Sequence, residues 1–188
     1  SGSLSRGHRF HSSGDIQITS PASYRDTLHD AFVMVDFAER RELIRQGVIA
    51  AAKTANGQAV IDESLLEEVT SLNEWPVPLM GRFEEHFLEV PAEALVSSMA
   101  QHQKYFHVVD ANNKLLPLFI TVANIASADP QQVINGNERV IRPRLADAAF
   151  FYNTDLKTTL DARRETLRKI VFQSKLGTVY DKTARVSE

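Results

Sequence analysis

Apolar and β-branched residues gather in two runs near the middle of the chain, residues 105–109 and residues 115–123. Residues 110–113, which lie between them, read Asp-Ala-Asn-Asn. Asn and Asp side chains favour the tight turns that join antiparallel strands. The pattern therefore predicts a β-hairpin.

Earlier runs of similar character predict additional strands. Residues 77–83 form one of them, and Pro76 and Pro78 restrict it to a sheet edge or to the start of a strand. Proline has this effect because it donates no hydrogen bond to a neighbouring strand. The alternation of residues 16–19 and the apolar run at residues 32–35 predict two more strands.

Apolar residues spaced three and four apart predict helices around these strands. The helices expected before residue 102 begin at Pro21, Asp36, Asp62 or Ser64, and Pro91. Residues 130–153 and 156–176 are also expected to be helical, with a break at Gly136 because glycine tolerates a positive φ. Early strands and late helices predict an α+β fold: a mainly antiparallel sheet of five or six strands packed by helices, followed by a helical C-terminal extension.

Three segments are expected along the chain. Residues 1–5 are mostly small and include no initiator Met, which is typical of a cloning remnant and linker. Residues 6–128 contain the predicted strands and are expected to form the α+β module. Residues 129–188 are expected to form the helical extension.

Composition excludes several classes of protein. With 188 residues, 43% hydrophobic and 24% charged, the chain is able to bury a core without disulfides or metals. It has no cysteine, which excludes disulfide frameworks and thiolate nucleophiles and favours the cytoplasm. Its longest apolar runs are far shorter than the roughly 20 residues of a membrane-spanning helix, so no membrane partner is expected.

The formal charge of −3 is unevenly distributed. Residues 1–137 carry 10 Lys or Arg and 17 Asp or Glu, a net charge of −7, whereas residues 138–188 carry 11 and 7, a net charge of +4. A basic C-terminal part points to a polyanionic partner such as nucleic acid. Its alternating acidic and basic residues are also typical of a solvated helix with internal ion pairs, and charge alone favours this second interpretation.

Familiar catalytic and metal-binding patterns are absent from the sequence. There is no His-Glu-x-x-His motif, no Gly-x-Ser-x-Gly motif, and no glycine spacing typical of a phosphate-binding loop. His8 and His11 lie three apart, but a strand there would place them on opposite faces. We therefore assign no catalytic residue and no metal ligand to this chain.

The most informative segment is residues 136–155, in which three arginines precede three aromatic residues. Arginine donates bidentately to phosphate and stacks on bases, and aromatic rings also stack, so RNA contact is chemically possible. The alternative is structural: Glu138 pairs with Arg142 and Arg144 pairs with Asp147 along a helix, while the aromatic residues pack in a core. The candidates for RNA contact are Arg139, Arg142, Arg144, Lys157, Arg163, Arg164 and Arg168.

Several ordered runs are more specific than a short motif, and they include residues 7–10 (Gly-His-Arg-Phe), 83–96, 129–134 and 136–155. In this order the runs resemble the beta subunit of the bacterial tetrameric glycyl-tRNA synthetase. The resemblance covers nearly the whole chain and implies an internal fragment of that longer subunit. It also implies that residues 6–128 are similar to the editing-type domain of the phenylalanyl-tRNA synthetase beta subunit. Residues 129–188 would then lead toward a helical HD-type domain.

The resemblance implies a function as well. In this family the alpha subunit carries the aminoacylation site for glycine and ATP, and the beta subunit supplies tRNA binding. The resemblance therefore implies a noncatalytic part of glycine–tRNA ligase that supports tRNA binding and assembly, has no cofactor of its own, and depends on the alpha subunit for the use of ATP. Expected partners are the alpha subunit, the remainder of the beta subunit and tRNA for glycine. The alternative is a purely structural module that contacts other protein domains and no tRNA.

Overall fold

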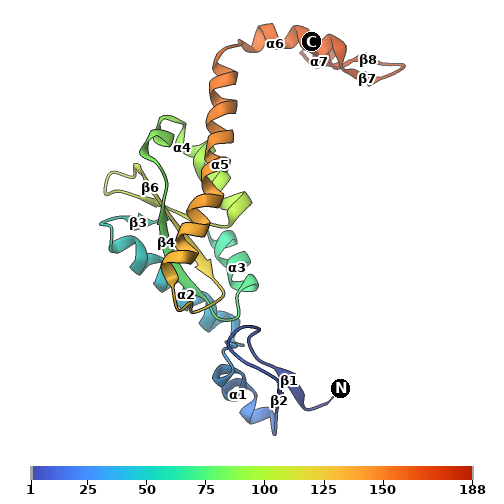
Figure 1. Cartoon of the computed structure of the whole chain (residues 1–188). Coiled ribbons are helices and arrows are strands. Elements are labelled where there is room, and N and C mark those ends of the chain that lie inside the picture. Colours follow the sequence, from blue (N-terminus) through green and yellow to red (C-terminus); the bar gives the residue numbers. More distant parts are fainter. Residues whose placement is uncertain (1, 188) are drawn as a thin grey trace. The chain divides into compact units, whose positions relative to one another are not determined.

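The computed structural model describes residues 2–187 (Figure 1). The strands are β1 (Leu4–Arg6), β2 (Asp15–Gln17), β3 (Gln58–Ala59), β4 (Val77–Arg82), β5 (Phe106–Val109), β6 (Leu115–Ala123), β7 (Val171–Gln173) and β8 (Gly177–Thr178). The α-helices are α1 (Tyr24–Asp30), α2 (Phe37–Lys53), α3 (Glu63–Leu72), α4 (Ala92–Ser97), α5 (Pro130–Leu156), α6 (Leu160–Thr166) and α7 (Val179–Ser187). The chain forms two compact units, a first unit that ends at Ala146 and a second unit that begins at Asp147.

The first unit is built around the sheet β3-β5-β6-β4, in which every neighbouring pair of strands is antiparallel. Strands β5 and β6 form the hairpin that the sequence predicted. Strand β4 is an edge strand, as its prolines required, and Pro78 pairs with Val122 of β6. These observations confirm the α+β fold class with a mainly antiparallel sheet. The domain boundary predicted at residue 128 stays a prediction.

The N-termini of helices α2, α3 and α5 lie at the positions that the sequence predicted. The Asp36 carboxylate accepts a hydrogen bond from the first turn of α2, and the Asp62 carboxylate does the same for α3. Asp62 rather than Ser64 is therefore the N-cap of α3. Pro130 is the first residue of α5, where its missing N–H costs no helical hydrogen bond.

Strand β6 is buried on both faces. Leu118, Phe119 and Ile120 are consecutive and all buried, although successive side chains of a strand point to opposite faces. Leu118 and Ile120 belong to the core that the sheet forms with α2 and α3. Phe119 points the other way and stacks on Tyr105 of the adjacent chain segment, with ring centroids 4.6 Å apart. The sheet therefore requires helical cover on both sides.

Helix α5 is fixed to the Tyr105 side of the sheet. Its Ile141 and Leu145 are fully buried. The Tyr105 hydroxyl donates a hydrogen bond to Asn137 Oδ1 at 2.6 Å, and burial raises the pKa of Tyr105 to about 12. These contacts determine which face of α5 is left exposed.

Asn124, just after β6, connects three segments of the first unit. Its Oδ1 accepts hydrogen bonds from the backbone N–H groups of Glu74 and Trp75, both at 2.8 Å. Its carbonyl oxygen lies 2.7 Å from Nε2 of His8, a side chain that is 1% exposed. Nδ1 of His8 accepts from the Phe10 N–H, so Nε2 carries the proton and donates to Asn124. The N-terminal segment is thereby attached to the end of the sheet.

The expectation for the two N-terminal histidines is wrong. Residues 9–11 form a turn between β1 and β2, not a strand. The His8 and His11 rings consequently lie 4.8 Å apart instead of on opposite faces. His11 Nε2 accepts a hydrogen bond from the Ala126 N–H at 3.0 Å, which is a second attachment of this segment.

The strand predicted at residues 32–35 is also absent. Phe32 has a φ of 62°, and the Val33 N–H donates to the Leu28 carbonyl, so this apolar run closes helix α1 in a Schellman-type cap. The Phe32 ring then packs edge-on against Trp75, with centroids 5.2 Å apart. Local apolar packing explains the run without a strand.

Two expectations for the C-terminal part are wrong as well. Helix α5 continues through Gly136 without a break, and it also contains Pro143. The helix expected at residues 156–176 ends early, because β7 and β8 form an antiparallel pair within the otherwise helical extension. Among residues 2–187, no helix is long and apolar enough to cross a lipid bilayer.

Replacing Asn124 by Ala should lower the free energy of unfolding by about 1–3 kcal/mol, because two backbone N–H groups lose their acceptor. Asn124→Asp keeps the acceptor oxygens and should cost less. Urea unfolding of the two variants measures the difference. Equal losses in both variants would contradict this role for the side-chain oxygen.

Two glycine-to-alanine substitutions should have opposite effects on the stability of the protein. A Cβ at Gly81 of β4 would lie 2.4 Å from the buried Phe119 ring, so Gly81→Ala should destabilise the protein by about 1–3 kcal/mol. A Cβ at Gly136 meets no atom within 4 Å, so Gly136→Ala should stabilise helix α5 by about 0.5–1 kcal/mol. Melting temperatures check both signs, and a loss of stability in Gly136→Ala would refute the uninterrupted helix.

Candidate nucleic-acid interface

The three arginines between residues 139 and 144 are all exposed on helix α5. Arg142 forms an ion pair with Glu84, and its guanidinium holds the pKa of the Glu84 carboxyl below the usual value. Arg139 and Arg144 form no ion pair with any residue from 2 to 187. These two side chains therefore present positive charge with no paired carboxylate.

The ion pairs expected along the helix are not formed within the described part of the chain. The Glu138 carboxylate accepts a hydrogen bond from the Arg82 backbone N–H at 2.9 Å and does not pair with Arg142. Arg144 and Asp147 also form no ion pair. The arginines of α5 thus do not stabilise their own helix in the way that the sequence spacing suggested.

The aromatic residues after these arginines are mostly accessible. Phe150 and Phe151 are 65% and 63% exposed, and their rings meet edge-on with centroids 5.6 Å apart. Tyr152 is partly buried. The expectation that all three pack in a core is therefore wrong for the two phenylalanines. Their exposed faces are available for stacking.

In the second unit, Lys157 is exposed and Arg163 is structurally committed. Lys157 has no ion pair among the described residues. Arg163 pairs with Asp155 at 2.6 Å and donates to the Thr154 carbonyl at 3.4 Å. Arg163 therefore connects α6 to the end of α5.

Arg164 and Arg168 both lie over the ring of Tyr180. Their guanidinium carbons are 5.0 Å and 3.5 Å from the ring centroid. Arg168 also pairs with Glu165 at 2.7 Å, which lowers the pKa of the Glu165 carboxyl. No sequence pattern pointed to Tyr180, because only the unpredicted hairpin brings helix α7 back beside these arginines.

The seven candidates therefore fall into two groups. The committed group has partners within the chain and consists of Arg142, Arg163, Arg164 and Arg168. The uncommitted group is exposed and has no ion pair among residues 2–187, and consists of Arg139, Arg144 and Lys157. A phosphate group would contact any one of these three side chains without displacing an existing partner.

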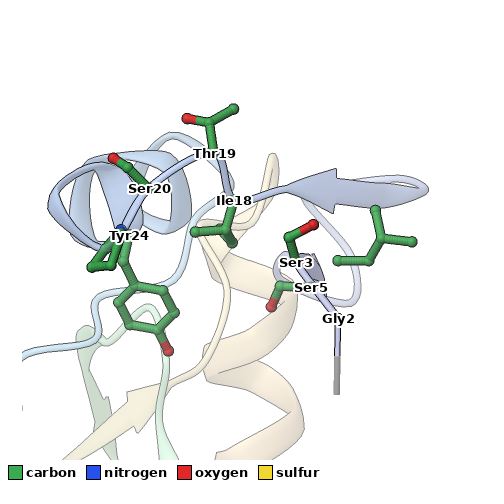
Figure 2. A pocket seen from close by; sticks show the side chains of 9 residues that line it. Gly2, Ser3, Ser5, Ile18, Thr19, Ser20 and Tyr24 are labelled. Atoms are coloured by element: carbon green, nitrogen blue, oxygen red, sulfur yellow. The ribbon is translucent and has the colours of Figure 1, made fainter.

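Two hollows of the first unit are alternative candidates for a site. One of them has a volume of about 570 Å³ and lies beside β1, β2 and the start of α1. Figure 2 shows the side chains that line it. Its lining contributes hydroxyl groups and apolar side chains but no Lys, Arg, His, Asp or Glu. The lining residues are Gly2, Ser3, Leu4, Ser5, Ile18, Thr19, Ser20, Pro21 and Tyr24. The arrangement offers no charged group to bind phosphate or transfer a proton.

The other hollow has a volume of about 560 Å³ and is lined by both apolar and charged residues. Lys104, whose φ is 59°, pairs there with Glu68 at 2.8 Å. His107 also lines it, and burial lowers the pKa of His107 below its ordinary value of 6.5. Between residues 2 and 187, no three His, Cys, Asp or Glu side chains gather in a way that would hold a metal ion.

Comparisons with known proteins agree over the length of the chain. Residues 1–188 match the family described as glycyl-tRNA synthetase beta subunit. The chain is 65% identical to the glycine–tRNA ligase beta subunits of Marinobacter nauticus and Hahella chejuensis, and 56% identical to that of Stutzerimonas stutzeri. These alignments cover at least 99% of the chain but 27% of each relative. The chain thus spans about a quarter of the length of these relatives.

Stability should depend on pH through His107. Burial favours neutral His107 in the folded state, so the unfolded state binds more protons as the pH falls below about 6.5. The free energy of unfolding should therefore decrease between pH 7 and pH 5. In His107→Gln this decrease should be smaller, as urea unfolding across the pH range measures. An identical pH dependence in the variant would contradict the assignment.

Proposed function

Because this chain belongs to the glycyl-tRNA synthetase beta-subunit family, we propose that it forms a noncatalytic part of glycine–tRNA ligase that supports tRNA binding and assembly. Its partners would be the alpha subunit, the remainder of the beta subunit and tRNA for glycine. ATP would be used through the alpha subunit, and this chain would hold no cofactor. The match over all 188 residues carries the proposal.

The uncommitted group supports the tRNA contact. Arg139, Arg144 and Lys157 are exposed and lack ion pairs within residues 2–187. Binding of phosphates to such side chains releases counterions from the nucleic acid and is favourable at low salt. The acidic remainder of the chain, with a net charge of −7 over residues 1–137, would repel phosphates and restrict RNA to the basic part.

A second candidate function is a module that contacts only other protein domains. The committed group favours it, because Arg142 and Arg163 hold structural elements together within the chain. Replacement of Arg163, Arg164 and Arg168 together would disturb the contacts with Asp155 and Tyr180. Those three arginines are therefore unsuited to a test that must separate binding from folding.

The test is the triple variant Arg139→Gln, Arg144→Gln and Lys157→Gln in the assembled enzyme. It should weaken tRNA binding and flatten the dependence of log K on log salt by up to about 0.9 for each phosphate that is no longer neutralised. Its thermal stability should change little, because exposed side chains without partners typically contribute within about 0.5 kcal/mol. Filter binding over a range of salt concentrations measures the slope.

A matched control removes three exposed charges from the acidic part. The variant Arg9→Gln, Lys53→Gln and Lys114→Gln should keep the affinity and the salt slope of the unchanged enzyme. If the test variant also keeps both, while it folds normally, the module contacts only protein. If both variants bind tRNA equally weakly, tRNA contact is not restricted to the uncommitted group.

A further inference from the structure

The second unit has regular secondary structure but no core among its described residues. Every described residue from Asp147 to Ser187 is at least partly exposed. Helices α6 and α7 and strands β7 and β8 contain no buried residue. Burial of apolar area is the main favourable contribution to folding, so this unit lacks the usual source of stability.

Local polar contacts hold the second unit together instead. The Asp181 carboxylate accepts hydrogen bonds from the N–H and hydroxyl of Thr178, at 2.7 and 2.8 Å, and caps the start of α7. The Val179 N–H donates to the Ile170 carbonyl at 2.8 Å. Each such bond contributes little net stability, because it replaces hydrogen bonds to water, and the conformational entropy lost when a residue is ordered offsets that contribution. These bonds select a conformation but stabilise it weakly.

The β7–β8 hairpin presents apolar side chains to solvent. We define the hairpin face as four residues that are exposed by 51%, 69%, 43% and 51%: Ile170, Val171, Phe172 and Leu176. An isolated two-stranded hairpin is marginally stable at best in water and needs a further strand or a packed surface. Grouped exposed apolar residues of this kind mark interaction sites.

We propose that the hairpin face packs against the part of the beta subunit that this chain does not span. The chain covers 27% of the length of its relatives, so a large partner is covalently attached in the complete subunit. Covalent attachment gives that partner a high effective concentration, which a second copy of the chain lacks. RNA is a poorer occupant, because these four side chains carry no charge to neutralise phosphates, and the Lys182 ammonium beside them already lies over the Phe172 ring, 4.3 Å from its centroid. The contact is independent of the proposed tRNA binding.

Amide hydrogen exchange tests the contact by comparison of the 188-residue chain with the full-length beta subunit. In the full-length subunit, amides of β7, β8 and α7 should exchange at least about tenfold more slowly than in the 188-residue chain. Amides of β5 and β6 should be protected in both proteins, which shows that the shorter chain is folded. Equal exchange of the hairpin in both proteins would overturn the proposal.

A pair of substitutions in the full-length subunit tests the apolar character of the face. Val171→Asp places a charge on the hairpin face and should abolish the additional protection of β7 and β8. Ser174→Asp places the same charge on an exposed polar residue of the hairpin turn, outside the hairpin face, and should leave that protection unchanged. Protection that survives Val171→Asp would overturn the proposal.

Binding of the hairpin face to a second copy of the chain, or to RNA, would give different results. A second copy would protect the hairpin in the 188-residue chain as its concentration is raised. RNA would protect the hairpin in the full-length subunit only when tRNA is added. Either result overturns the proposal, and neither depends on whether the uncommitted group binds tRNA.

Discussion

The burial of strand β6 on both of its faces determines how the first unit is built. Leu118 and Ile120 require cover from α2 and α3, while Phe119 requires cover on the opposite side. Each fully buried large apolar side chain contributes about 1.5–3 kcal/mol, so neither face is dispensable. Helix α5 supplies the cover on the Phe119 side, because it is attached to the side of the sheet that carries Tyr105. The face of α5 that remains exposed is a consequence of this burial.

Polar contacts then fix positions that apolar packing leaves free. Asn124 accepts two backbone hydrogen bonds at the end of the sheet and a third from His8, so one residue sets three segments relative to one another. The Tyr105–Asn137 hydrogen bond likewise fixes the register of α5 along the sheet. Such bonds add little net stability, but an unpaired buried polar group is costly, which excludes neighbouring registers.

Sequence patterns were most informative where a residue type has a strong local preference, and least informative where distant segments meet. Pro78 excluded an internal strand correctly, whereas Phe32 misled because it adopts a left-handed φ to close a helix against distant residues. The candidate site shows the same division. All seven cationic candidates were visible in the sequence, but Arg142 pairs with Glu84, 58 residues away. Spacing rules find partners three or four residues apart on a helix, so they suggested Glu138 instead.

The formal charge therefore overstates how much positive charge residues 138–188 have available to bind a polyanion. The net charge of +4 over residues 138–188 counts Arg163 and Arg168 as fully as Arg139. An exposed ion pair is weak, about 0–1 kcal/mol, so a phosphate is able to displace its carboxylate at little cost. The displaced carboxylate stays close by, however, and its repulsion offsets much of the attraction. Side chains without a nearby carboxylate partner avoid that repulsion. Whether a basic side chain already has a partner is therefore a better guide to phosphate contact than the number of basic residues.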